Sequence, residues 1–409
     1  MHKSFYQGNR KRLGELLPPD SVALVFAGEE LHRSADAYHL FAADRNFAYL
    51  TGIAQKNSIL LLEKTPEGEL RERLYLLPKD MMAERWTGRR LSAREAEACS
   101  GVADIRSTVD FDRDFAALEF STLYLDLFKN APTDYDRPAH RFAATHGDLQ
   151  IARLEPMVNR LRTIKQPCEI EALRKAESIT REGILAMMRA SRPGIYEYQY
   201  KAEFERTLGQ FGPAPAGFQS IISAGDNNFC IHYDAYTGQA KDGDMILNDV
   251  GAQWDGLIVD VSRGWPCNGK FTQKQRLLYA CALKTSDYMF SIIRPGMKMA
   301  DVDATIRRYN AKLLVEAGVM DSEEEVGKYM WHGGAHHIGW DVHDQVATPE
   351  FLEPGMVFCV DVGIYHEAWG IGFRLEDNCL VTEEGCENLS AAIPRTIEEI
   401  EAFMAGENA

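Results

Sequence analysis

The sequence predicts a protein of mixed α and β structure in two domains. Its 409 residues are long for one hydrophobic core, which favours two or three domains. Short apolar runs alternate with helical stretches up to about residue 160, and a long amphipathic stretch then begins at Pro167. We therefore expect a boundary between residues 155 and 166, with domains at 1–160 and 161–409.

Four short runs in the first domain have the length, the apolar content and the polar borders that are typical of strands. They alternate with helical stretches, so the first domain is expected to be a single α/β unit. The four predicted strands are Ser21–Phe26, Phe47–Leu50, Ser58–Leu62 and Leu123–Leu125.

The second domain contains a weak internal repeat. A predicted helix runs into Arg192-Pro193-Gly194 and is followed by a helix around residues 202–210; about a hundred residues later the same order recurs at Arg294-Pro295-Gly296 and residues 300–314. Proline lacks an N–H and glycine permits a reversal, so each tripeptide ends its helix. The domain is expected to be two related halves that face each other, a common location for a cleft.

Two aspartates are predicted on paired strands that an Asp-Gly turn joins. Asp249 lies in the predicted strand 245–251 and Asp260 in the predicted strand 257–262. A turn centred on residues 254 and 255 would place the two carboxylates directly opposite, and a turn centred one residue later would displace them by two residues. Like charges this close repel unless a cation lies between them. The alternative is a pair of strand-end aspartates in solvent.

Histidines concentrate in one segment, which holds four of the chain's eleven: His332, His336, His337 and His343. Such a density is unusual for a surface. Imidazole is a common metal ligand, but it also donates hydrogen bonds to an oxyanion, so we do not expect all four to be ligands. The alternative is a glycine-rich loop held together by hydrogen bonds.

Two later strands carry charges within apolar runs. Asp361 is the one charge in Phe358–Val362, and a buried carboxylate needs a partner or a metal. In Gly372–Asn378 the two-residue strand period places Arg374 and Glu376 on one face, where they could also be a structural Arg–Glu pair. Several carboxylates and one imidazole suit two Mn²⁺ or Co²⁺ ions that share a water. The candidate set is Asp249, Asp260, His336, Asp361 and Glu376.

Composition excludes several classes of function. A formal net charge of −16 argues against nucleic acid or an anionic membrane as the main partner. The polar start lacks the apolar core of a signal peptide, and no apolar run has membrane-spanning length, so a cytoplasmic location is expected. The eight cysteines form no CxxC pair and are interpreted as reduced, mostly buried thiols rather than ligands.

The motifs around these residues resemble those of a known family. Asp249-Val250-Gly251, followed by Asp260-Val261-Ser262-Arg263-Gly264, resembles a D-x-G…D-I-T-R-T run; His336 falls on the ligand histidine of an H-G-x-x-H motif, and Arg374-Leu375-Glu376-Asp377 resembles R-I-E-D. Tyr49–Gly52 and Arg85–Leu91 resemble signatures of the N-terminal domain of the same family. The chain is thus similar over nearly its whole length to the pita-bread metallopeptidases of the creatinase/aminopeptidase family (M24), and within it to the aminopeptidase P group.

The resemblance implies an α+β fold, with an α/β creatinase-type domain followed by a pita-bread catalytic domain of two pseudo-twofold halves. It implies an aminopeptidase whose substrate is a peptide with proline at the second position. The implied cofactors are two divalent metal ions, Mn²⁺ first and Co²⁺ or Zn²⁺ as alternatives. The implied assembly is a homodimer or homotetramer, in which Trp86 is a weak candidate to reach a neighbouring subunit, although packing within the chain is the favoured role.

The resemblance also implies a role for each site residue. The metal ligands would be Asp249, Asp260, His336, Asp361 and Glu376. Asp361 would also move the proton of the attacking water, and the implied catalytic residues are His232, His343, Asp361 and Arg374. The substrate carbonyl and the tetrahedral intermediate would contact two histidines and a third would line the proline-side pocket: His232, His343 and His332.

Departures from the family pattern keep alternatives open. The family has glutamate where this chain has Asp361, and the lost methylene retracts the carboxylate by about 1.5 Å, far beyond the ~0.2 Å tolerance on ligand distances. Ser262 and Gly264 replace threonines, and the segment 365–370 is short. The alternatives are a prolidase limited to Xaa-Pro dipeptides, and a metal-poor binding protein or creatinase-like non-peptidase hydrolase.

Overall fold

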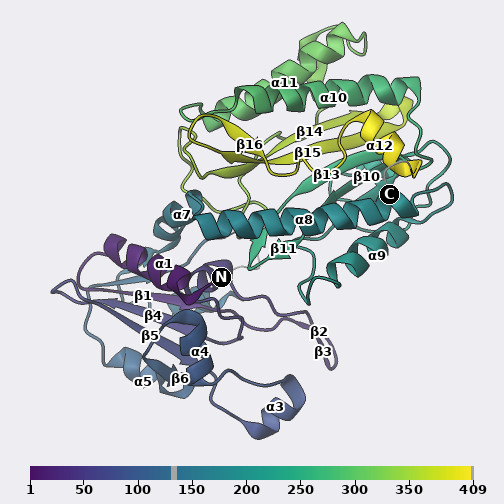
Figure 1. Cartoon of the computed structure of the whole chain (residues 1–409). Coiled ribbons are helices and arrows are strands. Elements are labelled where there is room, and N and C mark those ends of the chain that lie inside the picture. The colour runs from purple at the N-terminus through teal and green to yellow at the C-terminus, as the bar shows by residue number, and fades with distance from the viewer. Residues whose placement is uncertain (130–135, 407–409) are drawn as a thin grey trace. The chain divides into compact units, whose positions relative to one another are not determined.

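The chain divides into two compact units in a computed structural model that describes residues 1–129 and 136–406 (Figure 1). The first unit is Met1–Arg162 and the second is Thr163–Ala409. Each unit has its own sheets and its own helices, so the two are described in turn.

The first unit is built on a six-stranded mixed sheet in the order β6-β5-β4-β1-β7-β8. β1 pairs antiparallel with β4 and parallel with β7. The strands predicted at residues 21–26, 58–62 and 123–125 are confirmed as β1, β4 and β7. The six strands are β1 (Ser21–Phe26), β4 (Ile59–Lys64), β5 (Leu70–Leu76), β6 (Ile105–Ser107), β7 (Thr122–Leu125) and β8 (Ile151–Arg153).

Helices cover this sheet and complete its core. Phe111 and Phe115 of α5 pack with Val22 and Leu24 of β1 on one face, and α1, α2 and α4 contact one another elsewhere in the unit. A small hairpin, β2 (His32–Ser34) and β3 (Ala37–Tyr38), projects from the unit. The helices are α1 (Lys3–Leu16), α2 (Arg45–Thr51), α3 (Met81–Thr87), α4 (Ala93–Ser100), α5 (Phe111–Ala116), α6 (Pro138–Thr145) and α7 (Glu155–Thr163).

Two expectations for this unit are wrong. Residues 47–50, predicted as a strand, lie in helix α2, because the Asp44 carboxylate caps its first N–H groups and Gly52, at φ 69°, ends it. Both capping residues were visible in the sequence, but the run of four apolar residues outweighed them. Trp86 does not pack within the unit, since it lies on α3 with 86% of its surface exposed.

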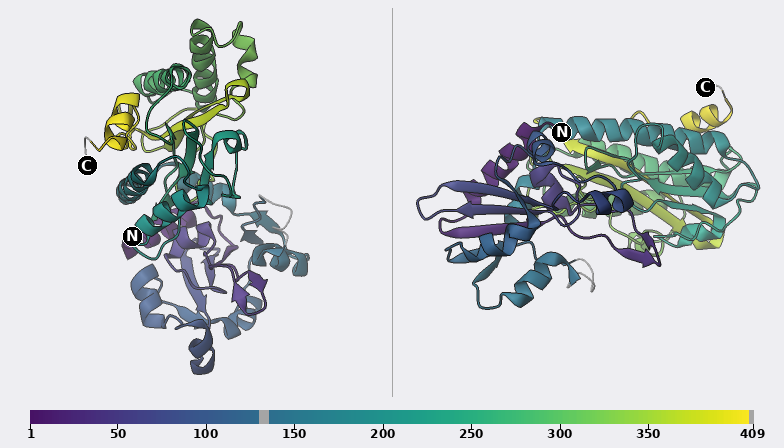
Figure 2. Two further views of the ribbon diagram at one scale, coloured as in Figure 1. Left: turned by 90° about the vertical axis from the view of Figure 1, so that its right-hand side faces the viewer. Right: turned by 90° about the horizontal axis from the view of Figure 1, so that it is seen from below.

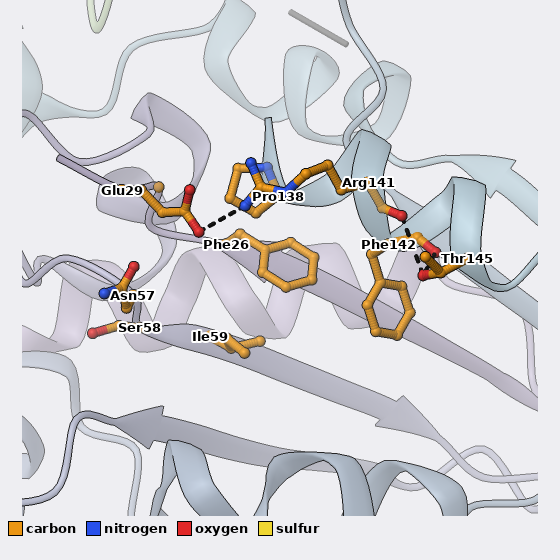
Figure 3. A pocket seen from close by; sticks show the side chains of 10 residues that line it. Phe26, Glu29, Asn57, Ser58, Ile59, Pro138, Arg141, Phe142 and Thr145 are labelled. Atoms are coloured by element: carbon orange, nitrogen blue, oxygen red, sulfur yellow. Dashed lines mark hydrogen bonds and ion pairs between the residues drawn. The ribbon is translucent and has the colours of Figure 1, made fainter. Parts of the chain in front are cut away.

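The first unit also contains a pocket of about 520 Å³ (Figure 3). Phe26, Ile59 and Phe142 give it an apolar lining, and Arg141 donates to Glu29 across 2.6 Å at its edge. The pocket is therefore lined mainly by apolar side chains, and the charges of Arg141 and Glu29 at its edge neutralise each other.

Long helices of the second unit pack alongside its strands. α10 contacts β14 and β15, and Figures 1 and 2 show α8 and α10 running alongside β10, β13, β14 and β15. The strands form two three-stranded sheets, β13-β10-β9 and β14-β15-β16, and a short pair, β11-β12. Strand bounds are β9 (Ile221–Ala224), β10 (Met245–Val250), β11 (Gln253–Trp254), β12 (Leu257–Ile258), β13 (Val261–Pro266), β14 (Val357–His366), β15 (Ile371–Val381) and β16 (Cys386–Asn388).

The predicted repeat is present as two similar successions of elements. In the first half α8 ends before Pro193-Gly194 and α9 follows; in the second half α10 ends before Pro295-Gly296 and α11 follows. Gly194 and Gly296 have φ values of 89° and 82°, the left-handed conformation that glycine permits at low cost. The helices are α8 (Pro167–Ala190), α9 (Glu197–Leu208), α10 (Gln273–Ile292), α11 (Met299–Glu316) and α12 (Ile397–Met404).

Helices of the described ranges are all too short or too polar to cross a lipid bilayer. All eight cysteines are free thiols, as expected from the sequence, and none forms a disulfide.

Candidate metal centre

The turn between β10 and β13 fixes the spacing of the first two carboxylates. Trp254 pairs with Leu257, so the turn is centred on Asp255 and Gly256, whose φ values of 50° and 89° suit a tight hairpin. Asp249 therefore pairs with Ser262. Of the two registers left open by the sequence, the one that displaces Asp260 by two residues is the observed one.

Asp260 lies between β12 and β13, where its backbone is held by a side chain from another strand. The amide oxygen of Asn378 accepts from the Asp260 N–H at 3.0 Å, and the amide nitrogen of Asn378 donates to the Asp260 carbonyl. Both residues are buried. This clamp on the main chain leaves the Asp260 carboxylate available to the site.

β14 and β15 bring the other two carboxylates together. Asp361 of β14 pairs directly with Glu376 of β15. Cys359 precedes Asp361 by two residues and so lies on the same face of the strand. The Ser262 hydroxyl donates to Oε2 of Glu376 at 2.9 Å, which links this hairpin to β13.

The histidine-rich loop is pinned along β14 by backbone hydrogen bonds. The Cys359 N–H donates to the His336 carbonyl at 2.9 Å, and the Asp361 N–H donates to the Gly334 carbonyl at 2.8 Å. As a result, Nε2 of His336 lies 3.6 Å from Oδ2 of Asp260 and 3.7 Å from Oε1 of Glu376. One imidazole thus joins the carboxylates.

Donor atoms in this cluster form two groups of three that share Glu376. In each group the candidate ligand atoms all lie within 4.8 Å of one another. One group is Asp249, Asp260 and Glu376, and the other is His336, Cys359 and Glu376. A shared carboxylate between two donor groups is the arrangement that two neighbouring ions require.

The cluster is short of hydrogen-bond donors for its carboxylates. In the described part of the chain, one buried oxygen of each carboxylate has no hydrogen-bond partner: Oδ1 of Asp249, Asp260 and Asp361, and Oε1 of Glu376. Burial, followed by the neighbouring charges, raises the pKa of Asp260 and of Glu376 well above the ordinary range. Buried, unpartnered anionic oxygens of this kind fit divalent cations.

A chain of side-chain contacts connects the two ends of the cluster. Nδ1 of His332 lies 3.1 Å from Oδ2 of Asp361, and its Nε2 lies 2.9 Å from the Tyr365 hydroxyl. Arg374 donates to that hydroxyl and to Oδ2 of Asp249, each at 3.0 Å. Burial opposes protonation of His332, but the charge of Asp361, the hydrogen bond to Asp361 and the hydrogen bond to the Gly333 backbone together raise the His332 pKa.

Arg374 therefore has a different partner from the one that the strand period suggested. It shares a face with Glu376, but its guanidinium reaches Asp249 of β10. It also donates through two nitrogens to the Ile231 carbonyl, at 3.2 Å each. Burial works against its charge, yet Tyr365 and Asp249 raise its pKa, so it stays cationic.

The two histidines expected to contact the substrate lie at the surface of the site. His232 and His343 are both exposed, and the His343 ring is 4.2 Å from the His336 ring. The loop that carries His232 is held by the buried Glu197, which accepts from the Tyr233 hydroxyl at 2.7 Å and from the Gly238 N–H at 2.6 Å. His337 is buried, and the centre of its ring lies 6.0 Å from that of the Phe358 ring.

Sequence reasoning missed three side chains in this arrangement: Cys359, Tyr365 and Ser262. The two-residue strand period would have placed Cys359 beside Asp361. Tyr365 was seen only as the start of a short loop, and it lies inside β14. Ser262 was noted as a replacement near Asp260, whereas its hydroxyl bonds to Glu376.

Comparison with known proteins identifies the family. The model of metallopeptidase family M24 matches residues 171–383, which is more than half of the chain. The chain belongs to metallopeptidase family M24. A second model, the N-terminal domain of aminopeptidase P, matches residues 6–124. The resemblance to this family and the fold that it implied are confirmed.

Individual M24 proteins match over almost the whole length. The Xaa-Pro aminopeptidase of Escherichia coli is 31% identical over 428 residues, with 98% of this chain and 97% of the relative covered. A solved structure from Bacillus anthracis has a TM-score of 0.96 and 34% identity over 100% of both chains. Zn-substituted E. coli aminopeptidase P in complex with product has a TM-score of 0.90 and 30% identity, with 100% and 99% covered.

Proposed function

We propose that this M24 protein is a dinuclear-metal aminopeptidase that hydrolyses the bond between an N-terminal residue and a following proline. The observation that carries the proposal is the pair of three-donor groups that share Glu376, with a buried unpartnered oxygen on each of four carboxylates. The specificity is supported by relatives of E. coli and Haemophilus influenzae named Xaa-Pro aminopeptidase, each 31% identical.

The residues of the cluster fit two divalent cations. Asp249, Asp260 and Glu376 offer hard oxygen donors, while His336 adds a borderline nitrogen. Mn²⁺ is proposed first, and Co²⁺ or Zn²⁺ as alternatives. Two such ions would lower the pKa of a water between them and polarise the scissile carbonyl.

Asp361 is proposed as the group that moves the proton. Its unpartnered Oδ1 is available to accept a proton from the attacking water, and Oδ2 is held by His332. The same carboxyl group then gives the proton to the leaving proline nitrogen, because general acid–base catalysis requires return of the proton to the departing group.

His232 and His343 are proposed to donate hydrogen bonds to the substrate carbonyl and to the oxyanion that forms from it. Their exposure leaves both rings free to meet a peptide. Arg374 is proposed to act at a distance, because its contacts are with Asp249, Tyr365 and the Ile231 carbonyl. It fixes a ligand carboxylate and the loop next to His232.

A product assay tests the activity. The purified chain, loaded with Mn²⁺, is expected to release the first residue from Xaa-Pro-Xaa peptides faster than it splits Xaa-Pro dipeptides. Cleavage of Xaa-Pro dipeptides alone would favour the alternative hypothesis of a prolidase. A metal content near zero after Mn²⁺ supplementation, with no cleavage of either peptide, would refute the proposal. It would instead favour the hypothesis of a metal-poor binding protein or a non-peptidase hydrolase.

We also infer a cytoplasmic homodimer or homotetramer. The support for an assembly is the exposed apolar surface of α3, where Met81, Met82 and Trp86 are 67%, 61% and 86% exposed. Apolar side chains gathered on one short helix are typical of a contact between subunits. Light scattering on the protein as it elutes from a sizing column measures the mass of the assembly. Trp86→Ala is expected to reduce the fraction of chains that are found in the assembly.

A further inference from the structure

One thiol lies inside the carboxylate cluster. Cys359 is fully buried on β14, and its sulfur accepts from the His336 N–H at 3.3 Å. Its Sγ, a ring nitrogen of His336 and a carboxylate oxygen of Glu376 all lie within 4.8 Å of one another. Ligands about 2.0–2.3 Å from one ion lie at most roughly twice that distance apart, so the three are close enough to share an ion.

Asp361 is placed differently. Among the described residues it belongs to neither donor group. Its Oδ2 is turned to His332 at 3.1 Å, and its side chain is one methylene shorter than the glutamate of the family pattern. The second donor group is therefore completed by the sulfur of Cys359, whose strand position is fixed by a 2.9 Å backbone bond to His336.

We propose that Cys359 is a ligand of the second metal ion, together with His336 and Glu376, and that this position selects Zn²⁺ or Co²⁺ over Mn²⁺. The inference rests on the proposed dinuclear site. Thiolate is a soft donor that favours Zn²⁺ and Co²⁺, whereas the group Asp249, Asp260 and Glu376 offers oxygen alone and keeps the preference for hard ions. On binding, the thiol releases its proton to solvent and the S–metal bond forms.

Optical spectroscopy of the Co²⁺-loaded protein tests this assignment without any activity measurement. The wild-type chain is expected to show a near-ultraviolet thiolate-to-Co²⁺ charge-transfer band, and Cys359→Ser is expected to lose it. In competition between Zn²⁺ and Mn²⁺, the Zn²⁺ preference of Cys359→Ser should fall by about tenfold or more, the scale on which ligand surroundings alter affinity.

Cys379→Ser is the matched control. Cys379 is also buried, but it lies three residues from Glu376 on β15 and so faces the other side of the strand. This variant should keep the band and the Zn²⁺ preference. Two Co²⁺ per chain with no thiolate band in the wild type would overturn the ligand role and leave the dinuclear site standing. Failure of the wild type to bind Co²⁺, Mn²⁺ or Zn²⁺ would overturn both proposals.

Discussion

Asp361 and Asp249, on strands from different halves of the second unit, are joined by an unbroken chain of polar contacts. His332 contacts Asp361 at 3.1 Å, the Tyr365 hydroxyl contacts His332 at 2.9 Å, and Arg374 bridges that hydroxyl to Asp249 at 3.0 Å on each side. The proposed proton carrier and a proposed metal ligand are thus held by one network.

Replacement of Asp361 should separate proton transfer from metal binding. In Asp361→Asn we expect kcat on a Xaa-Pro-Xaa peptide to fall by about 10²–10⁴-fold, the usual contribution of a general acid–base group. Metal content should stay near the wild-type value, because the two donor groups do not include Asp361. Elemental analysis together with kcat measures both. An unchanged kcat would contradict the proposed role.

The substitution Asp361→Glu tests whether the site is adapted to a side chain that is one methylene shorter than glutamate. Oδ2 of Asp361 lies 3.1 Å from Nδ1 of His332, so one more methylene has to displace this contact. We expect lower kcat than in the wild type, with metal content retained. A kcat equal to or above that of the wild type would indicate that the site only tolerates aspartate.

Tyr365→Phe should interrupt the network at its centre. Loss of the hydroxyl leaves His332 and Arg374 each without one buried partner, which costs about 1–3 kcal/mol of unfolding free energy, while the stacking of ring 365 on Trp331 can persist. We expect kcat to fall as well. The control is Tyr279→Phe, which deletes a 3.0 Å bond from another buried tyrosine to the Arg395 carbonyl. It should cost similar stability and leave kcat unchanged.

Removal of metal should destabilise the second unit. Without cations, the buried carboxylates of Asp249, Asp260 and Glu376 face one another with unpartnered oxygens. An ion that binds only the folded state adds about 2.7 kcal/mol at a concentration about 100 times its Kd. Chelation should therefore lower Tm and added Mn²⁺ should restore it in calorimetry. A Tm that does not respond to Mn²⁺ or to chelator would contradict the metal centre.

Glu177 of α8 predicts a dependence of stability on pH. Burial raises its pKa from 4.5 to about 8, and the Ser390 hydroxyl donates to it at 3.0 Å. Between these values the folded chain holds a proton that the unfolded chain has lost, so the contribution of this group to stability falls as pH rises. Glu177→Gln removes that loss, and its Tm relative to the wild type should increase from about pH 5 to about pH 8.

The control for Glu177 is Glu182→Gln on the same helix, where 40% of the side chain is exposed and Arg181 is its partner. Its Tm should follow that of the wild type at each pH. A Glu177→Gln curve parallel to the wild type over the whole range would show that the carboxyl group is ionised in the folded protein.

The sequence predicted those parts of the fold that follow from local chemistry. Pro167 begins α8, and the two Pro-Gly pairs follow the ends of α8 and α10, because missing N–H groups and glycine's conformational freedom act within a few residues. Phe47–Leu50 was misassigned since four apolar residues fit either a buried strand or a short helix, and only the caps at Asp44 and Gly52 distinguish them.

Within the candidate site, the positions of charged residues were predictable and their partners were not. Motifs located Asp249, Arg374 and Glu376. The pairing of Arg374 with Asp249, however, depends on how β10 packs beside β15, and the two residues are 125 positions apart in the sequence. Cys359 was missed for a related reason. The strand period places this cysteine beside Asp361 but does not mark it as a ligand, and the proposed role emerges only when the His336 loop lies against β14.

The two bonds from Arg374 to the Ile231 carbonyl have a consequence beyond structure. The same guanidinium donates hydrogen bonds to Asp249 and to the residue next to His232. A ligand that orders one of these two groups therefore also helps to order the other. Linkage makes such coupling reciprocal. A peptide held at His232 would raise the affinity of the site for the ion at Asp249, and a bound ion would raise the affinity for the peptide by the same factor.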